Sequence, residues 1–103
     1  MSDTFIYKVN KGSRYDDVEL AIKLALKNFR DRKYEKVDAH VSPGNYKIFD
    51  IKNSISDRSV INFIIRQVIR VGGDGKFENA TIAIQPIKNG KNSIFEEVNY
   101  FPY

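Results

Sequence analysis

Residues 44–71 read GNYKIFDIKNSISDRSVINFIIRQVIRV, and the secondary structure of this stretch decides the fold. In its first half, residues 45–56, isoleucines recur at a spacing that fits one face of a helix. The shorter run 46–51 could instead return as the second strand of a hairpin. We expect a helix over 45–56.

The second half, residues 60–71, carries two conflicting signals. Valine or isoleucine occupies positions 60, 61, 64, 65, 68 and 69, which matches a helical period. A β-branched run this dense loses side-chain freedom in a helix and fits a pleated sheet better. We therefore expect a long strand over 60–71. The alternative is a strand over 46–52 followed by a helix over 57–70.

Upstream, residues 4–9 are rich in β-branched and aromatic side chains and predict a first strand. Residues 14–30 predict a helix, in which Ser13 and Asp16 form a weakened capping box. One apolar stripe follows this helix, made by Val18, Ala21, Ile22, Ala25, Leu26 and Phe29.

A second strand is expected over residues 35–41, ended by the proline and glycine that follow Ser42. Val37, Ala39 and Val41 would share one face of this strand. Lys36, Asp38 and His40 would share the other face, which we expect to be solvated.

Downstream, Gly72–Gly75 predicts a turn, and the alternation over residues 77–84 predicts a strand. Asn89–Gly90 is a strong signal for a type I′ turn. Residues 88–103 then form a C-terminal extension, or tail, whose last four residues are Tyr-Phe-Pro-Tyr. This aromatic end could cover an apolar surface or recruit a protein partner.

The composition predicts one domain spanning residues 1–103, because 42% hydrophobic residues suffice for a core but the chain is short. The absence of cysteine excludes disulfides and thiolate metal sites, and with His40 as the single histidine we expect no metal and no cofactor. We expect no signal peptide, and the sequence has no apolar run that could cross a bilayer, so the expected location is cytoplasmic or nucleoid-associated.

The sequence offers no set of residues for catalysis, and we expect a protein that is not an enzyme. Asp38 and His40 lie at i, i+2, but nothing supplies a nucleophile or an oxyanion hole. Residues Gly72–Gly75 lack the Lys-Ser/Thr ending of a phosphate-binding P-loop.

The basic residues predict contacts with a phosphate backbone, consistent with a net charge of +4. Lys11 and Arg14 flank the junction between the first strand and the first helix, where helix amides favour anions. If residues 60–84 form a hairpin, Arg66, Arg70 and Lys76 would line an arm that contacts phosphates. The predicted partner is therefore DNA or RNA, bound with little sequence specificity.

Two segments resemble the Alba family of small chromatin- and RNA-binding proteins. The first, FIYKVNKGSR (5–14) followed by YDDVELAI (15–22), is similar to the family's first strand, basic loop and first helix. The second, IRVG (69–72), then Asp74-Gly75 and TIAI (81–84), is similar to its terminal arm. The likeness spans about residues 4–87.

The resemblance implies an α+β, two-layer sandwich of order β-α-β-α-β-β, here with the C-terminal extension. It implies a homodimer, and it matches Lys11 and Arg14 to the family's basic loop and Arg66, Arg70 and Lys76 to its arm. One departure is Asn45, which follows Gly44 where the family usually has a basic residue.

Two alternatives remain at this point. The alternative fold is ferredoxin-like, of order β-α-β-β-α-β. The alternative function is a small protein-interaction module, either regulatory or a virus-encoded inhibitor, that binds a protein partner through an exposed apolar patch.

Overall fold

The computed structural model describes residues 4–42, 44–52, 57–71 and 79–87. Within these ranges the elements follow the order β-α-β-β-α-β. Their bounds are β1 (Phe5–Val9), α1 (Tyr15–Asp31), β2 (Lys36–Ser42), β3 (Tyr46–Asp50), α2 (Asp57–Val71) and β4 (Ala80–Ile87).

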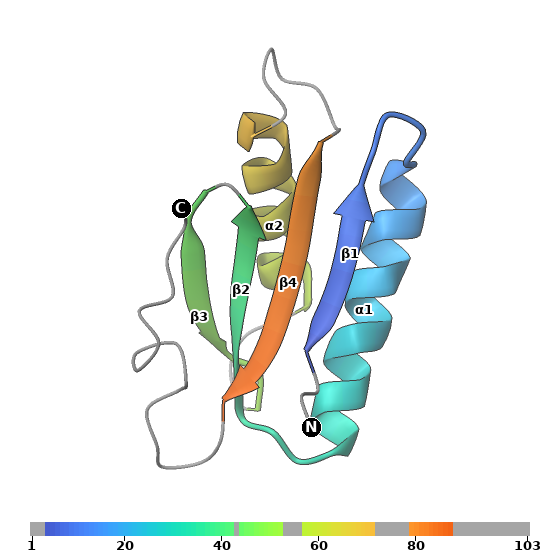
Figure 1. Cartoon of the computed structure of the whole chain (residues 1–103). Helices are drawn as coiled ribbons and strands as arrows, with labels where there is room; N and C mark the ends of the chain where they lie inside the picture. Colours follow the sequence, from blue (N-terminus) through green and yellow to red (C-terminus); the bar gives the residue numbers. More distant parts are fainter. Residues whose placement is uncertain (1–3, 43, 53–56, 72–78, 88–103) are drawn as a thin grey trace.

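The strands form one four-stranded sheet in the order β1-β4-β2-β3, with every neighbouring pair antiparallel. Both helices lie on the same side of this sheet, behind it in the view of Figure 1. The α+β two-layer sandwich predicted from the sequence is therefore confirmed. No helix among the described residues is long and apolar enough to span a bilayer.

The order of elements is that of the alternative, β-α-β-β-α-β, and the Alba-like order β-α-β-α-β-β is wrong. Residues 46–50 form a strand and not a helix, because they pair along β2, where Phe49 lies opposite Val37. Only the order along the chain matches the alternative, and in the sheet β2 and β4 hold the two central positions.

The expected long strand over 60–71 is also wrong, since this stretch lies in α2. As a helix it buries Val60, Ile61, Ile64, Ile65 and Val68 against the sheet. As a strand it would send these side chains alternately to both faces of the sheet, so the layer between the sheet and the helices could bury only part of the set. Burial contributes about 1.5–3 kcal/mol for each such side chain. The helix penalty of a β-branched residue is at most about 0.7 kcal/mol, so burial decides the outcome.

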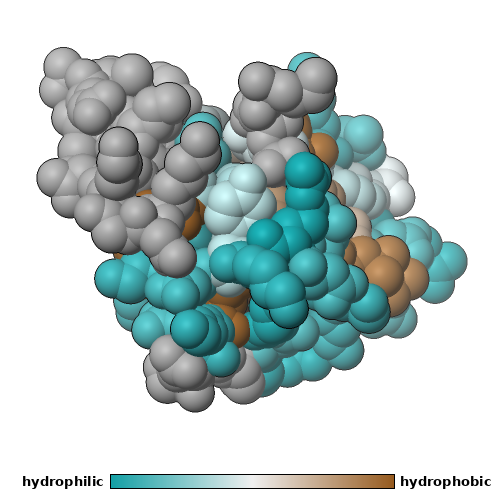
Figure 2. Space-filling view, turned by 90° about the horizontal axis from the view of Figure 1, so that it is seen from below, coloured by the Kyte–Doolittle hydropathy of each residue, from teal (hydrophilic) through white to brown (hydrophobic). Residues whose placement is uncertain are grey.

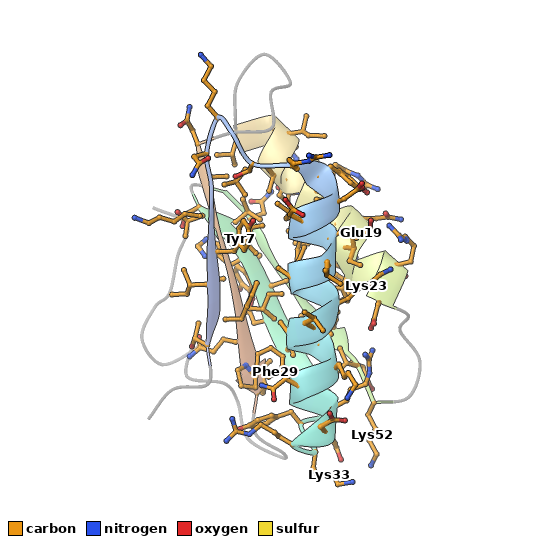
Figure 3. The ribbon with its side chains drawn as sticks, turned by 90° about the vertical axis from the view of Figure 1, so that its right-hand side faces the viewer. Tyr7, Glu19, Lys23, Phe29, Lys33 and Lys52 are labelled. Carbon is orange, nitrogen blue, oxygen red and sulfur yellow. The ribbon has the colours of Figure 1, made fainter. Side chains whose placement is uncertain are left out.

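The predicted first helix is confirmed, together with its apolar stripe. Val18, Ile22, Ala25, Leu26 and Phe29 are all buried in the core between the helices and the sheet. Figure 3 shows Phe29 and Tyr7 in this layer between α1 and the strands.

The C-terminal end of α1 is closed by a Schellman motif. The Tyr34 amide donates to the Phe29 carbonyl at 3.0 Å, and the Lys33 amide donates to the Arg30 carbonyl at 2.9 Å. Lys33 takes the left-handed position with φ of 70°. The rings of Phe29 and Tyr34 meet edge to face at 6.2 Å, which adds the hydrophobic contact typical of this motif.

The solvated polar face expected for β2 is wrong at two of its three positions. Lys36 is exposed, but Asp38 and His40 are 0% and 2% exposed. The prediction assumed that one face of β2 is exposed to solvent. In the sheet β2 is internal, so on this face Asp38 lies between Ile48 of β3 and Gln85 of β4, and His40 lies between Tyr46 and Ala83.

Candidate nucleic-acid interface

Lys11 lies at the tip of a tight turn between β1 and α1. The Asn10 amide donates to Ser13 Oγ at 2.9 Å, and the Ser13 amide donates to the Asn10 carbonyl at 3.0 Å. The Gly12 amide donates to Asn10 Oδ1 at 3.1 Å. These bonds close the turn from both ends, so the exposed side chain of Lys11 projects from a fixed backbone.

Arg14 is the N-cap residue of α1, and its extended backbone has φ of −104° and ψ of 140°. The predicted capping box is therefore wrong. The Ser13 hydroxyl is used within the turn, where it bonds Asn10, and Arg14 makes no side-chain cap bond to the helix. Amides at a helix N-terminus that lack a capping acceptor favour an anion, and Arg14 adds a full positive charge beside them.

Arg66 and Arg70 lie one turn apart on α2, and both are exposed. The β-hairpin arm on which the sequence placed them does not exist, because residues 57–71 are helical. Lys76, the third residue of that predicted arm, lies outside the described residues. No acidic residue occurs between Arg58 and Val71, so the two arginines carry the charge of this helix end alone.

The β1–α1 turn and the C-terminal end of α2 lie at the same end of the sandwich, the upper end in Figures 1 and 3. The fold therefore brings together two segments about fifty residues apart in the chain. We use the name basic surface for Lys11, Arg14, Arg66 and Arg70. None of the four has an ion pair within the described residues.

Three cations at the opposite end of the sandwich are paired with acidic side chains. Lys27 pairs with Asp31 at 2.8 Å, Lys52 with Glu35 at 3.0 Å, and Arg30 with Asp57 at 2.6 Å. Figure 2 looks onto this end and shows a mostly hydrophilic surface with small, separated hydrophobic areas. Lys52 and Lys33 lie at this end of the molecule (Figure 3). These pairs distinguish Lys27, Lys52 and Arg30 from the four cations of the basic surface, which have no ion pair within the described residues.

One cation near the basic surface was missed by the sequence reasoning. Lys8 is exposed on β1 and lies opposite Thr81 in the sheet, on the face away from the helices. Its position one residue before the strand's last residue places it beside the turn that carries Lys11. The strand pattern alone gave Lys8 no distinct signal, because every second residue of an edge strand is expected to be polar.

Two acids adjoin the basic surface. Asp16 and Asp17 are exposed in the first turn of α1, directly after Arg14 and Tyr15. They complement the helix dipole, and they also lower the positive potential near Arg14. Among the described residues, no three His, Asp or Glu side chains gather as a metal site would require.

Comparison with known proteins adds no relative: no family model, no curated protein and no solved structure matches this chain.

Proposed function

We propose that this protein binds the phosphate backbone of DNA or RNA, without catalysis and with little sequence specificity, through the basic surface. The observation that carries the proposal is the grouping of four exposed cations at one end of the fold, none of them ion-paired within the described residues. A side chain without an ion pair can contact a phosphate without first losing an interaction within the protein.

The form of the surface suits contacts with a phosphate backbone. Lys11 projects from a short turn and Arg14 from a helix N-terminus, and both features are common at phosphate contacts. Arg66 and Arg70 extend along α2, which allows contacts with successive phosphates. Contacts with phosphates carry no sequence information, so affinity should depend on charge.

The resemblance to the Alba family supports the proposal through its first segment only. Residues 5–22 keep the strand, basic turn and helix that the resemblance implies, whereas α2 replaces the first strand of the family's arm. The homodimer implied by the resemblance remains a prediction, which light scattering coupled to size-exclusion chromatography would test.

Fluorescence anisotropy with labelled duplex DNA and duplex RNA tests the proposal directly. Binding should weaken steeply between low and moderate salt, with a log–log slope of about −0.9 per neutralised DNA phosphate. If all four cations engage, the slope on DNA should be about −3.6. Absence of binding to either duplex at low salt would end the proposal.

A second candidate is a protein-interaction module. The predicted aromatic tail, residues 88–103, lies outside the described residues, but α1 carries another apolar surface. Leu20 and Leu24 are 56% and 57% exposed and lie one helical turn apart. Affinity capture with and without nuclease treatment separates the two functions, because a nucleic-acid-bridged partner is lost on nuclease digestion and a direct partner is kept.

A further inference from the structure

The side of α1 that points away from the sheet carries two exposed leucines. Leu20 and Leu24 are 56% and 57% exposed, whereas the apolar side chains on the sheet-facing side of the same helix are buried. Single exposed leucines are common on protein surfaces and need no partner. These two, however, lie in the middle of a regular row of exposed side chains: Asp17, Leu20, Leu24, Lys27 and Asp31.

This row has the spacing of a contact between two helices. Its members follow one another at intervals of three, four, three and four residues, as do the a and d positions where two packed helices meet. We use the name α1 seam for these five residues. Figure 3 shows Glu19 and Lys23 on the flank of α1 nearest α2, where Glu19 pairs with Arg58, so both lie beside the α1 seam and not in it.

The α1 seam is complementary to itself. Ile22 lies midway between Leu20 and Leu24, and also midway between Asp17 and Lys27. A two-fold axis at the level of Ile22 would therefore set Leu20 of one copy against Leu24 of the other, and Asp17 against Lys27. Each leucine contact and each contact between opposite charges would form twice.

The two charged residues are available for this contact. Asp17 is exposed and has no ion pair within the described residues. Lys27 pairs with Asp31 of its own helix, but its side chain is 71% exposed. Because an ammonium has three N–H donors, Lys27 can contact a second carboxylate without losing the first.

We propose that the α1 seam binds the α1 seam of a second copy of this chain, with the two helices antiparallel. A parallel pair would oppose Asp17 to Asp17 and Lys27 to Lys27, and like charges disfavour it. An unrelated protein partner would not require a surface that complements itself. The apolar contact consists of two leucines from each copy, less than a permanent dimer buries, so the association should be weak. It does not depend on nucleic-acid binding, since the α1 seam lies on the helical side of the sandwich and not at the end that carries the basic surface.

Sedimentation equilibrium of nuclease-treated protein tests the surface. From about 10 μM to about 1 mM, the range of weak complexes, the wild type should pass from monomer to dimer. Leu20→Gln with Leu24→Gln should stay monomeric. Ile6→Gln is the matched control, because it removes a side chain that is 61% exposed on the other face of the sheet, and it should dimerise as the wild type does. A wild type that stays monomeric, or a leucine variant that dimerises equally well, overturns the inference.

Charge variants test the antiparallel arrangement. Asp17→Lys and Lys27→Asp each place like charges opposite one another, so each variant alone should dimerise at least about tenfold more weakly than the wild type. An equimolar mixture of the two variants restores opposite charges at both contacts and should dimerise as the wild type does. Circular dichroism confirms that each variant is folded. The inference is overturned if either variant alone associates as strongly as the wild type, or if mixing the two restores nothing.

Discussion

Asp38 and His40 lie two residues apart on the same face of β2, both buried, and burial shifts their pKa values in opposite directions. The pKa of Asp38 is raised from 3.8 to about 7, and the pKa of His40 is lowered from 6.5. Burial disfavours the charged form of each group, which is the anion for aspartate and the cation for histidine. Lys36, Tyr46 and Asp50 are the other titratable groups on this face of β2 and β3.

This pair predicts a pH-dependent stability. Because folded Asp38 holds its proton more tightly than the unfolded chain, its ionisation lowers the free energy of unfolding as the pH rises from 3.8 to about 7. His40 has the opposite sign, since its contribution increases as the pH rises towards 6.5. Asp38→Asn removes the first effect and keeps the second.

Asp38→Asn should therefore be more stable than the wild type at pH 8, by up to about 4 kcal/mol. The two should converge near pH 4. Urea unfolding at several pH values measures the difference. A wild type more stable than the variant at pH 8 would contradict the raised pKa of Asp38.

Charge reversal should separate the two ends of the molecule. Lys11→Glu with Arg14→Glu is expected to abolish binding to duplex DNA, because it places two negative charges on the proposed phosphate contacts. Lys27→Glu with Lys52→Glu changes the net charge equally, but at cations already paired with Asp31 and Glu35. This control should reduce affinity far less. Anisotropy at fixed salt measures both, with circular dichroism to confirm folding. Equal losses would show that only net charge matters.

Lys33→Gly should stabilise the protein. Lys33 has φ of 70°, a left-handed conformation that costs a residue with a Cβ about 1 kcal/mol and costs glycine almost nothing. Lys33→Ala is the matched variant, since it removes the same side chain but keeps the penalty. The free energy of unfolding from urea titration should rise by about 1 kcal/mol for glycine relative to alanine. An alanine variant as stable as the glycine variant contradicts the assignment.

Gly44→Ala should destabilise the turn between β2 and β3. An added Cβ would lie 2.8 Å from the Val41 carbonyl oxygen and 3.3 Å from Val71 Cγ2. The first neighbour is backbone, so the turn itself must shift, and we expect a loss of about 1–3 kcal/mol. Gly12→Ala is the control, because its Cβ would meet nothing closer than Asn10 Oδ1 at 3.8 Å. Thermal unfolding should show a lower midpoint for the first variant only.

Much of the fold was predictable where one period dominates a segment. The apolar residues from Val18 to Phe29 repeat at helical spacing, and only a helix places them all on one face, so α1 was correctly predicted. The first two strands were likewise predicted within a residue, whereas the strand expected over 77–84 lies at Ala80–Ile87 and continues past Pro86. Of the site, the sequence identified Lys11 and Arg14 as neighbours, because they are separated by one short turn.

The sequence by itself determined the α+β class, the amphipathic α1 and the positions of the charges along the chain. Only the tertiary structure decided that residues 57–71 are helical, because the choice depends on whether the sheet leaves one apolar face or two to be covered. It also decided that the C-terminal end of α2 lies at the same end of the sandwich as the β1–α1 turn, and that Asp38 is buried. These outcomes depend on the order of the strands in the sheet. Strand order determines which residues meet across the fold, and no local sequence pattern encodes it.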